Sequence, residues 1–383
     1  MKQNNKQGMI YVHVPFCASR CIYCDFYSTT QSASVRAQYV EATCNEIMMR
    51  TNYLPTNNIK TIYFGGGTPS QLAPKEIEKI LDCIFKYYQV DNNAEITLEC
   101  NPDDIDKTFV QSTKRLGINR VSLGVQSFDD DILHLLNRRH NAQEAINAVE
   151  TLHHNDIDNI SIDIIYGLPR QTCNSFSHDL DQAFALPIKH LSSYALSVEK
   201  GTALDKKIRQ NELQTANEDV FVKEFSLLMQ QAECHGFNHY EISNFAIPGF
   251  ESKHNSSYWD GTPYLGIGPG AHSFDGENRQ YNLPSLSEYI SQSALGKVPH
   301  TTEVLSDNER FDEWVFVCLR TKRGLSLSLT EHKFGKQLLA YLLKNAQQHI
   351  EKGRLIKDGD KLSIAQPYIM VSNDIICDLM VAE

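Results

Sequence analysis

Short runs of β-branched and aromatic residues alternate with amphipathic segments along the first half of the chain. Such runs, bounded by Gly, Pro and Asn, predict strands, and apolar residues at helical spacing predict helices. The predicted strands are Met9–Val14, Lys60–Phe64, Glu95–Glu99, Arg120–Val125, Asn159–Tyr166 and His190–Val198. The predicted helices are Val35–Arg50, Pro74–Tyr88, Asp104–Leu116, Asp129–Asn137, Asn141–His154 and Ser175–Leu186. This alternation predicts an α/β fold with a parallel sheet, here a partial (β/α)6 relative of the TIM barrel.

The pattern changes twice after this region. A helix is predicted at Asn217–Cys234, and residues 236–300 are rich in polar and Gly positions, which predicts a loop-rich extension. Residues 301–383 predict a small α+β domain of winged-helix-like type, with two or three amphipathic helices and short strands at Arg354–Ile364 and Tyr368–Val371. The expected division is therefore a barrel core at 1–235, the extension at 236–300 and an accessory domain at 301–383.

Three cysteines directly follow the first predicted strand, at the spacing CxxxCxxC: Cys17, Cys21 and Cys24. Three thiolates on one loop can bind three corners of a [4Fe–4S] cluster and leave the fourth iron open. A zinc site is the alternative, with His13 or Asp25 as the fourth ligand. Disulfides are a weaker alternative, because the first residues, MKQNNKQG, lack the apolar run of a secretory signal.

Other unusual residues also stand at the ends of predicted strands. Gly65–Gly67 with Thr68 and Pro69 follow the second strand, Glu99 ends the third, and Gln126 follows the fourth. Because the carboxyl ends of barrel strands carry the active site, we expect these residues to share a rim with the cysteines. Glu99 and Asp163 are carboxylates in apolar strands, which need a partner such as ribose hydroxyls, an ammonium group or Arg138.

Composition limits the partners. The chain has 36 Lys and Arg against 47 Asp and Glu, a net charge of -11, which argues against nucleic acid as a partner. No apolar stretch approaches the roughly 18 residues of a membrane span, so we expect a cytoplasmic protein, with peripheral membrane contact left open. The remaining cysteines lack ligand spacing and are predicted to be ordinary core or surface residues: Cys44, Cys83, Cys100, Cys173, Cys234, Cys318 and Cys377.

The cysteine spacing resembles the signature of the radical S-adenosylmethionine (SAM) superfamily. The longer string YVHVPFCxxxCxYCDF, with YEISNFA at Tyr240–Ala246 and LRTxxG at Leu319–Gly324, resembles its coproporphyrinogen dehydrogenase-like branch. This resemblance implies a [4Fe–4S] cluster on the three cysteines and SAM on the fourth iron. It also implies a SAM pocket formed by Tyr11, Tyr23, Gly66, Gly67, Thr68, Gln126, Arg138 and Ala195. Glu99 and Asp163 are expected to belong to the same pocket. The alternatives are core packing for the two tyrosines and a structural salt bridge for Arg138.

Phe26 separates two branches of this family. Decarboxylating members carry a fourth cysteine there, whereas Phe26 together with KHNxxYW at Lys253–Trp259 resembles the HemW branch of haem chaperones. The resemblance implies a protein that binds haem and delivers it to acceptors, including membrane respiratory proteins, without being an enzyme. His254 is the candidate haem ligand, beside the flat surfaces of Tyr258 and Trp259; the alternative is a histidine that only hydrogen-bonds a loop.

Two other functions stay open at this point. One is oxygen-independent decarboxylation of coproporphyrinogen III through a SAM-derived radical, and the other is radical SAM chemistry on a different substrate. The sequence also leaves open whether the chain forms a homodimer.

Overall fold

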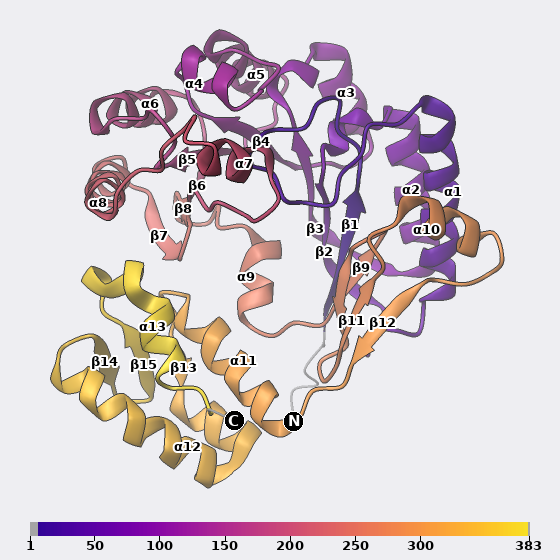
Figure 1. Cartoon of the computed structure of the whole chain (residues 1–383). Coiled ribbons are helices and arrows are strands. Elements are labelled where there is room, and N and C mark those ends of the chain that lie inside the picture. The colour runs from indigo at the N-terminus through magenta and orange to yellow at the C-terminus, as the bar shows by residue number, and fades with distance from the viewer. Residues whose placement is uncertain (1–6, 382–383) are drawn as a thin grey trace.

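The computed structural model describes residues 7–381. Its barrel is an open, curved sheet. One sheet contains twelve strands in the order β12-β11-β10-β9-β1-β2-β3-β4-β5-β6-β8-β7. Its central six strands are parallel: β1 (Gly8–Val14), β2 (Asn58–Gly66), β3 (Gln89–Cys100), β4 (Arg120–Gln126), β5 (Ile160–Tyr166) and β6 (His190–Ala195). Figure 1 shows helices along the outer face of these strands. The predicted α/β partial barrel is confirmed.

The helices between the strands follow from their apolar spacing. They are α1 (Ala33–Met49), α2 (Pro74–Tyr87), α3 (Lys107–Arg115), α4 (Asp130–Leu135), α5 (Ala142–His154) and α6 (Cys173–Ala185). In α2, Ile77, Ile80 and Ile84 recur on one face and are buried against the sheet. Helix α3 begins later than predicted, because the side chain of Asp106 caps it by accepting the N–H of Phe109 at 2.7 Å.

The extension at 236–300 contains short helices and strands that the sequence did not predict. After α7 (Ala203–Arg209) and α8 (Glu218–Cys234), this region forms β7 (Asn238–Glu241), β8 (Asn244–Ala246), α9 (Lys253–Trp259), β9 (Tyr264–Ile267), β10 (His272–Phe274), β11 (Arg279–Asn282), α10 (Leu286–Ser293) and β12 (His300–Glu303). These strands have three or four residues, too few for an alternating pattern. They widen the sheet at both edges, and β12 crosses the boundary expected at residue 301.

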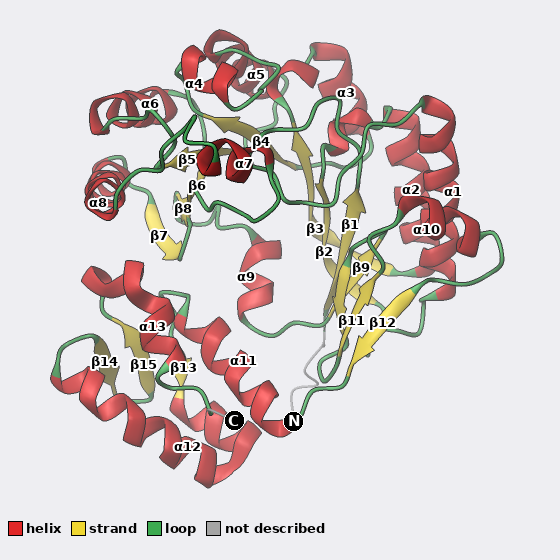
Figure 2. Cartoon of the chain, viewed as in Figure 1, coloured by secondary structure: helices red, strands yellow, loops and turns green. Residues whose placement is uncertain are grey.

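The C-terminal domain has its own core. It contains α11 (Asp307–Leu319), α12 (Leu327–Glu351), α13 (Ser372–Cys377) and a sheet of β13 (Leu325–Ser326), β15 (Lys361–Ile364) and β14 (Leu355–Asp358), as Figure 2 shows. The strand predicted at Arg354–Ile364 is a hairpin that turns at Gly359, where φ is 54°. The strand predicted at Tyr368–Val371 is part of a 3-10 helix, Gln366–Val371, which has Pro367 in its first turn. Within residues 7–381, every helix is too short or too polar to cross a membrane.

A buried carboxylate on α1 ties the extension to the barrel. Glu46 accepts hydrogen bonds from the backbone of Gly268 at 2.8 Å, the amide of Asn282 at 2.8 Å and the hydroxyl of Tyr289 at 2.6 Å. Arg50, one turn later on α1, forms an ion pair with Glu46 at 3.2 Å. Because Glu46 is fully buried, its charge is stable there only with all these donors in place.

We expect Glu46→Ala to lower the free energy of unfolding by about 3–5 kcal/mol, because it leaves the charge of buried Arg50 without its carboxylate partner, and the N–H of Gly268 and the hydroxyl of Tyr289 without their acceptor. Urea unfolding measures this change. Glu41→Ala on the same helix is the control, because Glu41 pairs with Lys79 at the surface and the loss should stay below about 1 kcal/mol. Equal losses for the two variants would contradict this role for Glu46.

Candidate functional site

The cysteine loop and the glycine turn are joined by backbone hydrogen bonds. The N–H of Gly67 donates to the carbonyl of Val14 at 2.8 Å, and that of Thr68 donates to Phe16 at 2.7 Å. A Cβ on Gly67 would stand 2.7 Å from the oxygen of Phe16, and Gly66 has a φ of 109°, so both positions require glycine. Parallel pairing of β1 with β2 thus places the two motifs together.

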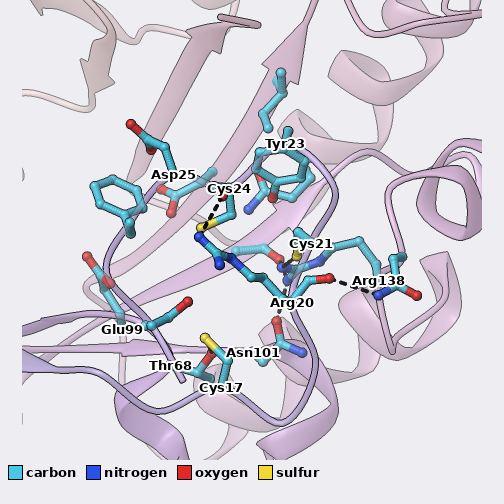
Figure 3. Close-up of a pocket in the computed structure, with 18 of the residues that line it drawn as sticks. Cys17, Arg20, Cys21, Tyr23, Cys24, Asp25, Thr68, Glu99, Asn101 and Arg138 are labelled. Carbon is cyan, nitrogen blue, oxygen red and sulfur yellow. Dashed lines mark hydrogen bonds between the residues drawn. The ribbon is translucent and has the colours of Figure 1, made fainter. Parts of the chain in front are cut away.

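A cavity of about 440 Å³ opens at this rim. Figure 3 shows the three cysteines, Tyr23, Thr68, Glu99 and Arg138 around it. The structure brings all but two of the predicted site residues into its wall: Cys17, Cys21, Tyr23, Cys24, Gly66, Gly67, Thr68, Glu99, Gln126, Arg138, Asp163 and Ala195. The rim predicted from strand ends therefore exists as a single cavity.

The three thiols lie in one part of the wall. The hydroxyl of Thr68 is 3.6 Å from Cys17 Sγ, and Arg138 Nη1 is 3.3 Å from Cys21 Sγ. A single zinc ion requires all its ligands around one centre, and no group of three or more His, Cys, Asp and Glu among residues 7–381 is arranged in that way. A cluster has a separate iron at each corner, so each of the three thiols can bind an iron of its own.

Arg138 is held by groups other than carboxylates. It donates to Cys21, to the side-chain oxygen of Asn101 and to the carbonyl of Gly124. The salt bridge considered from the sequence is therefore not formed. Sequence reasoning missed Asn101, although it directly follows β3 and precedes Pro102, so the strand-end rule could have found it.

Glu99 and Asp163 form the acidic part of the cavity. Glu99 accepts from the hydroxyl of Tyr63 at 2.7 Å and from the N–H of Gly66 at 3.2 Å, while Asp163 accepts from Ser122 at 3.2 Å. Burial raises the pKa of Glu99 to about 7, and it also raises the pKa of Asp163. The two carboxylates thus gain most from a ligand that donates hydrogen bonds or carries positive charge.

Gln126, Tyr23 and Ala195 complete the wall from three other elements. Gln126 ends β4 with a φ of 72°, a left-handed conformation that non-glycine residues rarely adopt. Such strain is typical of functional sites, where the fold holds a side chain in one direction. Tyr23 packs against an apolar cluster that includes Ile132 and Leu136, and Ala195 is exposed at the end of β6.

Tyr11 and His254 lie outside the cavity wall. Tyr11 hydrogen-bonds His13 Nδ1 at 3.1 Å and stacks on Tyr63, which matches the alternative of a packed aromatic residue. His254 is 1% exposed, with Nδ1 2.8 Å from the hydroxyl of Thr61 and Nε2 3.1 Å from that of Tyr258. Burial lowers the pKa of His254 to about 3. Both nitrogens already have partners, so this geometry favours the hydrogen-bonding alternative over haem ligation.

Comparisons with known proteins agree with these features. Residues 11–183 match the radical SAM superfamily and residues 305–366 match the HemN C-terminal domain. The "Heme chaperone HemW" of Bacillus subtilis is 31% identical over 367 residues, covering 95% of this chain and 97% of that protein. That of Synechocystis is 39% identical over 333 residues, covering 82% and 78%. The chain belongs to the HemW family. The resemblance described from the sequence is confirmed.

The chain also matches a solved structure of related fold. Coproporphyrinogen III oxidase (HemN) from Escherichia coli superimposes with a TM-score of 0.86 at 22% identity, covering 99% of this chain and 92% of that one. At this identity the match shows a common fold. Both the barrel and the C-terminal domain are therefore parts of one shared architecture.

Membership of the radical SAM superfamily implies a [4Fe–4S] cluster and SAM, and the cavity of this HemW chain fits both. Three thiols line one wall, and glycine backbone at Gly66 and Gly67 permits close approach by a ligand. Among residues 7–381, Arg138 Nε is buried without a hydrogen-bond partner, which leaves a donor for a bound group. Burial raises the pKa of Cys24 to about 11, so a positively charged metal is needed to hold it as a thiolate.

We expect the pH dependence of stability of cofactor-free protein to change in Glu99→Gln. Wild-type Glu99 holds a proton that the unfolded chain releases, so its contribution to stability falls as pH rises from 4.5 to about 7 and stays lost above that range. The variant lacks this term and should gain on the order of 2 kcal/mol relative to wild type across that range. Urea unfolding at several pH values measures the difference. Glu199→Gln, at an exposed position of the same cavity, is the control, and parallel curves for wild type and Glu99→Gln would contradict the prediction.

Proposed function

We propose that the chain binds haem and delivers it to acceptor proteins, while Cys17, Cys21 and Cys24 hold a [4Fe–4S] cluster to which SAM binds exchangeably. The relatives named "Heme chaperone HemW" match this chain over most of their length, and they support the haem function. The cavity with its three thiols supports the cluster. The acceptors are expected to include membrane respiratory proteins, reached by peripheral contact from the cytoplasm.

The observation that favours a chaperone over a decarboxylase is Phe26. It lines the mouth of the cavity and is 62% exposed, at the position where decarboxylating relatives carry a fourth cysteine. A phenyl ring can neither ligate metal nor transfer a proton. Phe26 therefore lacks the chemistry of a cysteine at this position, which argues against decarboxylation.

SAM would be held by residues of the same rim. Gly66, Gly67 and Thr68 line the cavity, and the hydroxyl of Thr68 lies 3.6 Å from Cys17 Sγ. Glu99 and Asp163 provide acceptors for hydroxyl or ammonium groups, and the remaining contacts come from Tyr23, Gln126, Arg138 and Ala195. Tyr11 would act indirectly, by packing on the Tyr63 ring whose hydroxyl fixes Glu99. The cluster held by the three cysteines would supply an open iron as the binding position for SAM.

Anaerobic haem titration of cluster-reconstituted protein tests the proposal. We expect saturable binding of a single haem by wild type, transfer to an acceptor lacking haem, and no conversion of coproporphyrinogen III. Cys17/Cys21/Cys24→Ala should lose cluster absorbance and SAM binding, because three thiolates hold the cluster. Cys173/Cys234/Cys377→Ala is the matched control, since these cysteines lie outside the cavity, and it should keep both. Absence of saturable haem binding, or turnover of coproporphyrinogen III, would overturn the proposed function.

A further inference from the structure

A second cavity lies where β7 faces the C-terminal domain. It has a volume of about 310 Å³, near the lower end for sites of organic ligands. Figure 1 shows β7 beside the C-terminal domain. Two backbone contacts join these parts: a bridge between Glu241 and Thr321, and a hydrogen bond from the N–H of Lys322 to the carbonyl of Tyr240 at 3.1 Å. The apolar part of the wall comes from both sides: Met229, Phe237, Ile242, Phe245, Leu319 and Ile369.

His239 stands in the wall of this cavity. His239 Nε2 lies 3.2 Å from the carbonyl of Ile242, and the ring stacks on Phe245 with centroids 4.5 Å apart. A carbonyl acceptor holds the proton on Nε2 and leaves the lone pair on Nδ1, the arrangement that metal-ligating histidines use. Burial lowers the pKa of His239 to about 4, so the ring is neutral at physiological pH.

Cationic side chains stand around the same cavity. Arg320, Lys322 and Lys361 line it, opposed by Glu233 and Glu241. Burial raises the pKa of Glu241 to about 7, so protonation near neutral pH removes part of the opposing negative charge. Arg320 donates to Asn373, but among the described residues its Nε is buried without a partner. These groups suit a ligand that carries carboxylates.

Haem presents an iron that binds imidazole, a flat apolar macrocycle and two propionate carboxylates. Resting on the proposed function, we propose that the cavity between β7 and the C-terminal domain is the haem site, with Nδ1 of His239 as iron ligand and Arg320 and Lys322 as propionate partners. The apolar wall contacts the macrocycle. A site at the seam of two domains leaves one edge of the haem accessible, as transfer to an acceptor requires.

The test compares two probes, iron protoporphyrin IX and metal-free protoporphyrin IX, on the full chain with its cluster reconstituted. His239→Ala should weaken binding of the iron porphyrin at least about tenfold and remove the absorbance of imidazole-bound iron. Binding of the metal-free porphyrin should change less than about twofold, because only the iron uses His239. Added imidazole should restore the iron signal. His332→Ala, an exposed histidine of α12, is the matched control.

Lys322→Glu provides a second variant that does not touch the iron ligand. It should weaken both porphyrins at least about threefold, because propionates are common to both, whereas Lys336→Glu on exposed α12 should change neither. SAM binding checks that each variant is folded. If wild type binds haem saturably and His239→Ala and Lys322→Glu bind it equally well, the assigned site is wrong and the proposed function stands. If wild type binds no haem, the proposed function itself fails.

Discussion

Parallel pairing of β1 with β2 is the constraint on which the site depends. In parallel strands, chain segments that leave the carboxyl ends emerge side by side. Here the loop after β1 carries the cysteines and the turn after β2 carries the glycines, and the bonds from Gly67 to Val14 and from Thr68 to Phe16 fix one against the other. Any side chain on Gly67 would separate them. The geometry of the thiols is therefore a property of the sheet register rather than of the cysteine loop alone.

The interior of the barrel adds a second constraint, because it contains charges. Glu95 is buried below the rim, where it accepts the N–H groups of Lys253 at 3.0 Å and His254 at 2.9 Å. These are the first N–H groups of α9, which have no partner within their own helix. The first N–H groups of α9 thus provide hydrogen-bond donors for the buried carboxylate, and the carboxylate provides the acceptor that these N–H groups lack within the helix. The KHNxxYW motif consequently closes the barrel from inside, and the ring of His254 lies 4.9 Å from that of Tyr63, whose hydroxyl holds Glu99.

Long periodic elements and strand ends could be predicted from the sequence, whereas short paired elements could not. Helix α2 and strand β5 are specified by their own apolar pattern, and the rim follows from chain order alone. Strand β9, in contrast, has four residues, and it pairs with the open edge of β1, which lies far earlier in the chain. The hydrogen-bond partners of His254 could not be predicted for the same reason. Thr61 and Tyr258 reach its ring only when β2 and α9 are brought together, whereas the sequence offers only its residue type and its motif.

An open barrel has two edge strands, and exposed edges invite unwanted pairing. At one edge the chain continues through β9 to β12, and at the other β7 is covered by the C-terminal domain. Among the described residues, few backbone contacts hold the C-terminal domain against β7: a bridge between Thr321 and Glu241, and a hydrogen bond from the N–H of Lys322 to the carbonyl of Tyr240. Side chains that cannot interdigitate across such a seam leave a hollow. The cationic side chains of this cavity belong to the C-terminal domain, and the imidazole belongs to the barrel. The two kinds of group therefore face one cavity only when the C-terminal domain is docked. Ligand binding at the seam is thus coupled to the protection of the edge strand.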